Sequence, residues 1–344
     1  MSKYGEGKDL PNLEMLKSHC FATIPKPEGN LTGRIALVSG ATSGLGYATA
    51  LHLARLGIST LVFPVRSLKK GEQYVQSLHK DVPSFRGKVK LVQVDLCRLD
   101  TIAPCVAQIE KEIDRLDFAI LNAGAARTNF TQTPDGYEET IQVNVLSTGL
   151  FAVLLLPLLD KTASLPQPSG AVPTQLKPQL EIVASDVHYW ARNDLFPRSG
   201  NFLEQINSEA FFKTLPHAEM YNISKLLDVF MARKLAALPA TEKIQVTSTN
   251  PGLCKSALRD DFGAVAAWLI NQISWSAEFG TRTFLHAVLE SHPSGSYISN
   301  GIRRPTSTFA CSEEGIKLED QFFKELVDLY AQKAPETKEI LGRA

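Results

Sequence analysis

The stretch that decides the fold is residues 34–57, RIALVSGATSGLGYATALHLARLG. It combines a short apolar strand, a turn with Gly40, Gly44 and Gly46, and an amphipathic helix. Glycines here permit a tight turn and let backbone N–H groups approach an anion, and the helix N-terminus adds partial positive charge. The turn could also bind nothing, but a strand before it and a helix after it are the context that a dinucleotide pyrophosphate requires.

The rest of the chain alternates short apolar runs with helical patterns. Continuous Val/Ile/Leu runs of this length favour a parallel sheet covered by helices on both faces. The apolar run 149–159 is expected to belong to a buried helix that ends near Pro157. Strands are expected at 35–39, 59–65, 90–94, 118–122, 180–185, 244–250 and 296–299, and helices near 45–57, 67–80, 99–114, 135–157, 217–238 and 277–291.

The composition is that of a globular α/β protein, with 44% hydrophobic and 21% charged residues in 344. Lys+Arg and Asp+Glu are both 36, and no basic run tracks phosphates, which argues against a nucleic-acid partner. Five cysteines without a C-x-x-C are typical of free intracellular thiols and predict no metal site. The N-terminus lacks a secretory apolar segment and the run 149–159 is too short to span a bilayer, so we expect a cytoplasmic protein without a transmembrane segment.

The chain divides into one continuous domain with additions. A lead-in covers residues 1–31, the main α/β domain 32–311 and a helical tail 312–344. The long aromatic-rich connections 186–216 and 253–276 follow strands, where open α/β sheets carry their binding sites.

The type of cofactor is indicated at the end of the second expected strand. NAD-preferring proteins usually place Asp or Glu there, on the ribose 2′-hydroxyl. This chain has Arg66, with Lys69 and Lys70 behind it. A guanidinium can bind a 2′-phosphate bidentately, so NADP(H) is favoured over NAD(H), although a solvated basic helix turn would give the same pattern.

Further motifs complete a recognisable set in chain order: SGATSGLG (39–46), Asp95, LNAG (121–124), Asn144, Ser185, Tyr221 with Lys225, and NPG (250–252). Together they resemble the short-chain dehydrogenase/reductase family over roughly residues 30–300. The resemblance implies a Rossmann-like, doubly wound parallel sheet of about seven strands in a single domain. The stretches VRSLKKGE (65–72), SDVH (185–188) and YNISKLL (221–227) resemble retinol-dehydrogenase-like members, and NPGLCKS (250–256) and the tail resemble fungal enzymes of secondary metabolism.

The resemblance implies a catalytic tetrad. Tyr221 would be the general acid, with Lys225 one helical turn away to favour its phenolate and to hold the nicotinamide ribose. Ser185 would bind the substrate oxygen, and Asn144 would fix a water that relays protons to Lys225. Taken singly, Ser185 and Asn144 could be ordinary structural residues.

The resemblance also implies the cofactor contacts. Asp95 would accept a hydrogen bond from the adenine amino group, and Ser256 would hold the nicotinamide carboxamide. The full set is Gly40, Ser43, Gly44, Leu45, Gly46, Arg66, Asp95, Leu96, Asn122, Ala123, Gly124, Tyr221, Lys225, Pro251, Gly252 and Ser256.

Two departures from the family pattern lie on either side of Ser185. Ala184 replaces the first serine of the usual pair, and Asp186 follows Ser185, facing either substrate or solvent. His188 would touch a substrate oxygen or be structural.

The connections carry many aromatic residues, which suits a bulky lipophilic carbonyl substrate if part of them line a pocket. The expected function is NADPH-dependent reduction of a ketone or aldehyde, such as a fungal secondary-metabolite intermediate. The alternatives are a cofactor-bound isomerase or cyclase and an inactive nucleotide-sensing interaction protein. The sequence leaves open the substrate, the direction and stereochemistry of the reaction, and a possible homodimer. The aromatic residues of the two connections are Tyr189, Trp190, Phe196, Phe202, Phe211, Phe212, Phe262, Trp268 and Trp275.

Overall fold

The structure is a computed structural model that describes all residues except 1–5, 10–16, 18, 217, 256–271 and 343–344. In the described residues, eight strands form one sheet in the order β3-β2-β1-β4-β5-β6-β7-β8. All neighbouring strands from β3 to β7 are parallel, and only β8 runs antiparallel, against β7. The prediction of a Rossmann-like doubly wound sheet is therefore confirmed.

The strands correspond to the predicted apolar runs, with one addition. β8 is only three residues long and all three are exposed, so no apolar pattern predicted it. The strands are β1 (Ile35–Val38), β2 (Thr60–Val65), β3 (Lys88–Gln93), β4 (Phe118–Leu121), β5 (Gln179–Val183), β6 (Gln245–Asn250), β7 (Ser296–Ser299) and β8 (Ile302–Arg304).

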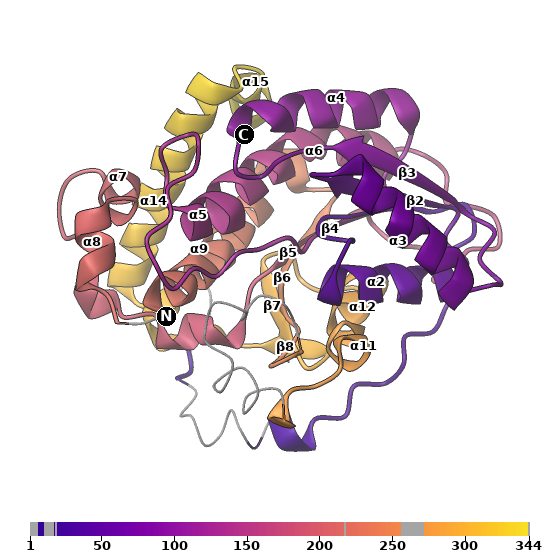
Figure 1. The fold of residues 1–344 in the computed structure, drawn as a ribbon, viewed down its shortest axis with the longest axis horizontal. Coiled ribbons are helices and arrows are strands. Elements are labelled where there is room, and N and C mark those ends of the chain that lie inside the picture. The colour runs from indigo at the N-terminus through magenta and orange to yellow at the C-terminus, as the bar shows by residue number, and fades with distance from the viewer. Residues whose placement is uncertain (1–5, 10–16, 18, 217, 256–271, 343–344) are drawn as a thin grey trace.

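Helices cover both faces of the sheet (Figure 1). Helices α4, α6 and α9 pack on one face and share the larger apolar core with α14, while α2, α3 and α12 pack on the other. Their bounds are α2 (Gly44–Arg55), α3 (Leu68–Asp81), α4 (Ile102–Glu112), α5 (Glu139–Ile141), α6 (Thr148–Ala163), α7 (Phe202–Ile206), α8 (Glu209–Thr214), α9 (Glu219–Ala236), α11 (Ala277–Gly280), α12 (Arg282–Leu289), α13 (Thr308–Cys311), α14 (Glu313–Lys333) and α15 (Thr337–Gly342). Short turns of 3₁₀ helix include η1 (Leu99–Thr101), η3 (Asp186–Trp190), η4 (Asn193–Leu195) and η5 (Pro239–Thr241).

The expected end of the long apolar helix was wrong. The helix continues through Pro157 to Ala163. Pro157 is exposed, so the missing N–H and the ring fall on the outer side of the helix, where solvent can satisfy the unpaired carbonyl. The same helix begins with a π-helical stretch η2 (Gln142–Ser147), which the sequence did not predict.

The span Glu139–Ala163 is apolar and long enough to cross a membrane by length and composition, but 94% of its most apolar window is buried inside the fold. This helix belongs to the core. All five cysteines are free thiols, as predicted.

The tail packs on the helical layer rather than extending away from it. α14 lies against α9, and α15 lies against α6. Arg233 of α9 and Glu319 of α14 form a fully buried ion pair (Nε–Oε1 2.9 Å). The Tyr330 hydroxyl donates to the Leu146 carbonyl in η2 (2.9 Å), so the tail is fastened close to the start of the long helix.

Candidate active site

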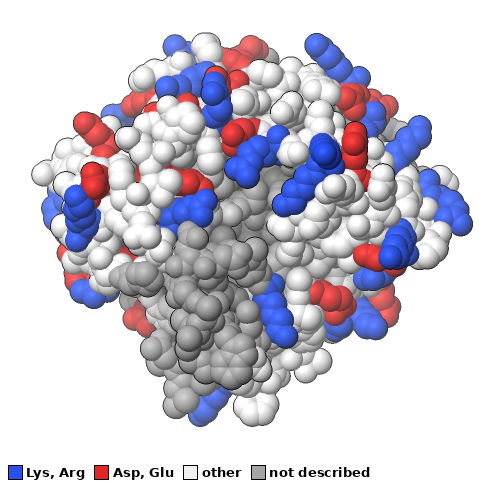
Figure 2. All heavy atoms as spheres, viewed as in Figure 1, with Lys and Arg blue, Asp and Glu red and all other residues white. Residues whose placement is uncertain are grey.

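A cavity of about 610 Å³ opens at the carboxyl ends of the parallel strands. The chain order reverses there between β1 and β4, which is where open α/β sheets bind ligands. Figure 2 shows Lys and Arg side chains around the hollow at the centre of this face. Of the predicted site residues, those that line the cavity are Gly40, Ser43, Gly44, Leu45, Arg66, Asp95, Leu96, Asn122, Ala123, Gly124, Tyr221, Lys225 and Pro251.

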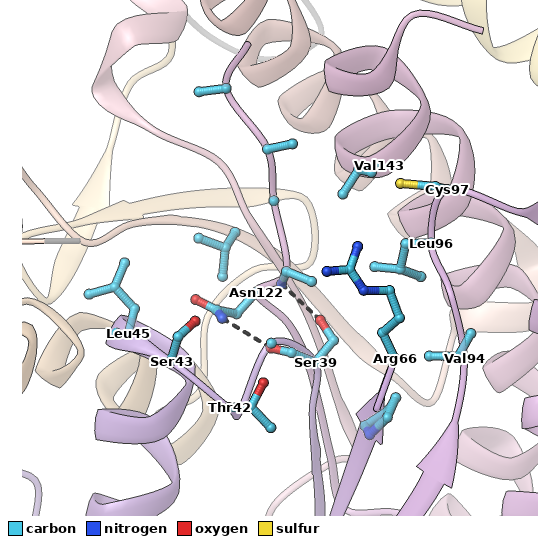
Figure 3. A pocket seen from close by; sticks show the side chains of 18 of the residues that line it. Ser39, Thr42, Ser43, Leu45, Arg66, Val94, Leu96, Cys97, Asn122 and Val143 are labelled. Atoms are coloured by element: carbon cyan, nitrogen blue, oxygen red, sulfur yellow. Dashed lines mark hydrogen bonds between the residues drawn. The ribbon is translucent and has the colours of Figure 1, made fainter. Parts of the chain in front are cut away.

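The glycine turn after β1 is held against the end of β4. Asn122 donates its amide to the Ser39 carbonyl (3.0 Å), and the Ala123 N–H donates to the Ser39 hydroxyl (2.9 Å; Figure 3). Gly40 has φ +70°, and a Cβ there would lie 2.9 Å from the Asn122 amide nitrogen. A Cβ on Gly46 would lie 2.3 Å from the Gly40 carbonyl, so Gly46 keeps the turn compact without lining the cavity.

The N-terminus of α2 faces this turn without a side-chain cap. Ser43 stands at the N-cap but accepts no hydrogen bond from the helix, and the first turn holds no acidic residue. By contrast, Ser67 caps α3 by accepting from the Lys70 N–H. The free N–H groups of α2 therefore suit an anionic group such as a pyrophosphate.

Basic residues gather at the end of β2. Arg66, Ser67 and Lys70 all line the cavity and are exposed, and Figure 3 shows Arg66 extending into it from the strand end. Arg66 makes no ion pair with any described residue, so its guanidinium is available to a phosphate.

The end of β3 supplies the next wall. Asp95 and Leu96 line the cavity, but one carboxylate oxygen of Asp95 already accepts from the Cys97 N–H (3.0 Å). Asp95 therefore stabilises its own turn, and its other oxygen is the one that could meet a ligand. Cys97 also lines the cavity, and burial raises the pKa of its thiol to about 11.

Tyr221 and Lys225 lie one helical turn apart on α9, and both line the cavity. The Lys225 Nζ is 5.6 Å from the centroid of the Tyr221 ring. Lys225 donates to the Val183 carbonyl at the end of β5 and to the Asp228 carboxylate, both at 2.8 Å. The lysine is thus fixed against the sheet beside the tyrosine.

Asn144 lies behind the cavity rather than in its lining. It is buried in η2, where its amide oxygen accepts from the Ala125 N–H (2.7 Å). Its amide nitrogen donates to the Ala125 carbonyl and to the Ser224 hydroxyl, both at 2.9 Å. Asn144 therefore ties the segment after β4 to the helix that carries Lys225, and its role toward a water stays a prediction.

Ser185 also does not line the cavity, although Val183 and Ala184 before it do. Its hydroxyl accepts from the Val187 N–H (3.4 Å) at the start of η3. A contact between Ser185 and a substrate oxygen stays a prediction.

The acidic and histidine side chains after Ser185 face the interior. Asp186 is half-buried, and its Oδ1 accepts from the Tyr297 and Ser299 hydroxyls of β7 (2.6 and 3.3 Å), while burial raises its pKa. His188 bonds the Ser185 carbonyl through Nδ1 (2.7 Å) and accepts from the Ser307 N–H through Nε2 (3.3 Å). Burial lowers the pKa of His188 to about 4, which fits the structural alternative for this neutral ring.

The NPG motif is divided between the cavity and the packing beneath it. Pro251 lines the cavity, whereas Gly252 does not. Gly252 has φ +74°, and a Cβ there would lie 2.4 Å from the Trp275 ring. Ser256 lies outside the described residues.

The aromatic connections contribute packing in the part of the chain that the structure describes. Trp275 stacks on His19 (4.1 Å between centroids), and Phe196 packs edge-on against Phe202 and Phe309. None of the described predicted aromatics lines the cavity, whose aromatic lining there consists of Tyr221 and Phe151 of α6. Phe262 and Trp268 lie outside the described residues.

Several lining residues were not predicted. Arg127 and Glu139 form an ion pair (2.7 Å) between the cavity and a smaller hollow of about 230 Å³. Twelve positions separate them in the sequence, so no local motif revealed the pair. Other lining residues outside the predicted set include Thr42, Ser67, Cys97, Val143 and Phe151.

A cavity of this kind, with a glycine turn and a Tyr–Lys pair at the switch point of a parallel sheet, defines a dinucleotide-binding oxidoreductase. The family model described as short chain dehydrogenase matches residues 34–166. The short chain dehydrogenase/reductase dmxR8 of Cryptosporiopsis is 32% identical over 320 residues, covering 91% of this chain and 95% of the relative. The short-chain dehydrogenase/reductase ffsI of Aspergillus flavipes is 31% identical, covering 92% of each. The chain belongs to the short-chain dehydrogenase/reductase family, as the motif set predicted.

Solved structures share the fold at lower identity. An NADPH-bound carbonyl reductase from chicken fatty liver superposes with a TM-score of 0.59 at 20% identity, covering 82% of this chain and 96% of that protein. The RhlG/NADP complex of Pseudomonas aeruginosa gives 0.58 at 20% identity, covering 78% and 95%.

Proposed function

We propose that this protein is an NADPH-dependent reductase of a ketone or aldehyde on a bulky, lipophilic small molecule. The observation that carries the proposal is that Tyr221 and Lys225 lie in register on α9 and line the same cavity as the glycine turn of β1. Fungal short-chain dehydrogenase/reductases that match over nine-tenths of the chain support a reductase. The proposal extends to a cytosolic role in fungal secondary metabolism.

The cavity residues fit NADPH at three points. The uncapped N-terminus of α2 and the compact turn at Gly40 suit the pyrophosphate. Arg66, with Lys70 beside it, offers positive charge to a ribose 2′-phosphate, where a carboxylate would repel it. Leu96 and the second oxygen of Asp95 offer an apolar wall and an acceptor to adenine.

The chemistry is then divided between cofactor and chain. When bound, the reduced nicotinamide supplies a hydride for the substrate carbonyl carbon. The Tyr221 hydroxyl donates a proton to the oxygen of that carbonyl as negative charge develops on it. The Lys225 ammonium stabilises the resulting phenolate, because a positive charge beside the ring favours the ionised form.

Two further residues complete the proposed tetrad. Ser185 stands two residues after Val183, whose carbonyl holds Lys225, and its hydroxyl would orient the substrate oxygen. Asn144 braces α9 through Ser224, next to Lys225, and would hold the water that returns a proton to the lysine.

The first test replaces Tyr221 by Phe and follows NADPH oxidation by absorbance with a panel of lipophilic ketones and aldehydes. We expect turnover to fall by about 100-fold or more, because the general acid is lost, while NADPH affinity stays near the wild-type value. Tyr47→Phe is the matched control: Tyr47 donates to Asp81 on the surface and does not line the cavity, so its turnover should be unchanged.

Comparable turnover in the Tyr221→Phe variant would contradict the proposal. Conversion of a substrate without NADPH consumption would instead indicate a cofactor-bound isomerase or cyclase. NADPH binding without turnover of any panel member would favour the nucleotide-sensing alternative.

A further inference from the structure

A buried carboxylate, Asp228, lies beside the lysine of the proposed tetrad. Its Oδ2 is 2.8 Å from the Lys225 Nζ, three residues earlier on α9. The two side chains are 1% and 5% exposed. No sequence motif singled Asp228 out, because a polar residue in the middle of a helix is ordinary.

The pair determines where the ammonium sits. A lysine has three N–H donors, and two of them are used here by Asp228 and by the Val183 carbonyl. These two acceptors hold Nζ at 5.6 Å from the centroid of the Tyr221 ring and leave one donor for a ligand in the cavity. Loss of either acceptor would let the flexible lysine chain leave this position.

Apart from its bond to Lys225, the Asp228 carboxylate is poorly hydrogen-bonded. Its Oδ1 is buried and has no hydrogen-bond partner in the described part of the structure. Burying such an oxygen costs free energy, so a carboxylate at this position is tolerated because of its pairing with Lys225.

The charges of the two groups also favour their pairing. Burial lowers the pKa of the Lys225 ammonium, but the Asp228 carboxylate and Tyr221 together outweigh burial and raise that pKa above the ordinary value. Burial raises the pKa of Asp228 to about 6, and the charge and hydrogen bond of Lys225 oppose this rise.

Other titratable groups on the elements around the pair have partners of their own, and among them Tyr330 is the one whose pKa responds to Asp228. This α14 residue is buried, and the charge of Asp228 helps burial to raise the pKa of its hydroxyl, which bonds the Leu146 carbonyl. The remaining groups are Glu181 of β5 bonded to Thr249, Glu139 of α5 paired with Arg127, Asp186 of η3 bonded to Tyr297, His188 of η3 bonded to Ser185, Tyr189 of η3 bonded to Pro305, and Glu319 of α14 paired with Arg233.

We propose that Asp228 is a positioning residue for the proposed reduction: it fixes the Lys225 ammonium and moderates the positive field that this ammonium exerts on Tyr221. The inference rests on the proposed function, because it assigns Asp228 a role only if Tyr221 and Lys225 act as described. The carboxylate touches neither substrate nor cofactor and acts through the lysine.

The test follows the titration of Tyr221 in the full-length protein saturated with NADP⁺, by ¹³C NMR of protein labelled at the tyrosine ζ carbon. The chain has eight tyrosines, and the Tyr221 signal is identified by its loss in Tyr221→Phe. In Asp228→Asn the amide oxygen can still accept from Lys225, but the compensating negative charge is lost, so we expect the Tyr221 midpoint to move to lower pH by about half a unit or more.

Two control variants define the effect. Glu181→Gln removes another fully buried carboxylate, in β5, and should leave the Tyr221 midpoint unchanged. Lys225→Met should move the midpoint to higher pH, because it removes the positive charge. Should Asp228→Asn fail to fold, Asp228→Ser is measured in its place; it removes the acceptor that holds Lys225 as well as the charge, so its midpoint should move to higher pH.

A wild-type Tyr221 midpoint in either Asp228 variant, or a midpoint above the wild-type value in Asp228→Asn, would overturn the inference. A merely structural Asp228 would lower stability and leave the midpoint in place. The inference fails separately from the proposed function, which falls if Tyr221→Phe keeps its turnover or if Lys225→Met leaves the midpoint unmoved.

Discussion

Glu181 shows how one enclosed side chain makes the fold sensitive to pH. It is fully buried in β5, where one oxygen accepts from the Thr249 hydroxyl (2.6 Å) and the other has no partner among the described residues. Burial raises its pKa well above the ordinary value. Because the folded state then holds the proton more tightly than the unfolded chain, Glu181 favours folding below its unfolded pKa and loses this contribution as the pH rises toward its folded pKa.

We therefore expect Glu181→Gln, which cannot ionise, to become more stable relative to the wild type as the pH rises. The free energy of unfolding of the variant minus that of the wild type should become more positive between about pH 5 and pH 8. Within this range the change should be about 1.4 kcal/mol for each pH unit by which the folded pKa of Glu181 exceeds its unfolded pKa. Urea unfolding at both pH values measures it. A difference that does not change with pH would show that folding does not raise the pKa of Glu181.

Among the elements, the contact between α9 and α14 depends on a buried charge pair. Arg233 and Glu319 are 2% and 0% exposed, and Arg233 also donates to the Ala310 carbonyl (2.8 Å). α9 carries Tyr221 and Lys225, so this contact also supports the helix of the proposed active site.

Glu319→Gln should cost on the order of 3 kcal/mol of unfolding free energy, because it leaves Arg233 buried beside a neutral group. Glu313→Gln on the same helix is the matched control: its pair with Lys317 is exposed, and its unfolding midpoint should stay near the wild-type value. Equal midpoints for the two variants would show that α14 does not rely on the buried pair.

The elements also show where prediction from sequence succeeded and failed. Runs of apolar residues and the turn residues between them predicted seven strands and the glycine turn, because strands and turns are specified by neighbouring residues. The continuation past Pro157 was missed because the outcome depends on which side of the helix faces solvent. The π-helical stretch at Asn144 was missed, and Asn144 is held there by tertiary contacts with Ala125. Lys225 and Asp228 stand three residues apart on one helix, but their burial against the Val183 carbonyl depends on the packing of α9 on β5.

At the scale of the whole molecule, the parallel order of the strands brings distant motifs to one cavity. The glycine turn follows β1, Arg66 follows β2 and Asp95 follows β3, while Tyr221 comes from α9. Strand order and the motif set made this convergence predictable. Two other features could not be predicted in this way: the ion pair of Arg127 with Glu139, and the packing of α14 and α15 over α9 and α6. They join segments that are distant in sequence and share no motif.

The central claim, that the cavity takes NADPH for a reductive reaction, is tested most directly by titrating the protein with NADPH and with NADH and following nicotinamide fluorescence. Wild type, Arg66→Ala and Lys69→Ala are compared; Lys69 is exposed and does not line the cavity. We predict tight NADPH and weak NADH binding, a loss of at least about tenfold in NADPH affinity in Arg66→Ala, and wild-type behaviour in Lys69→Ala. Equal affinity of the wild type for both nucleotides, or an unchanged NADPH preference in Arg66→Ala, would contradict the account.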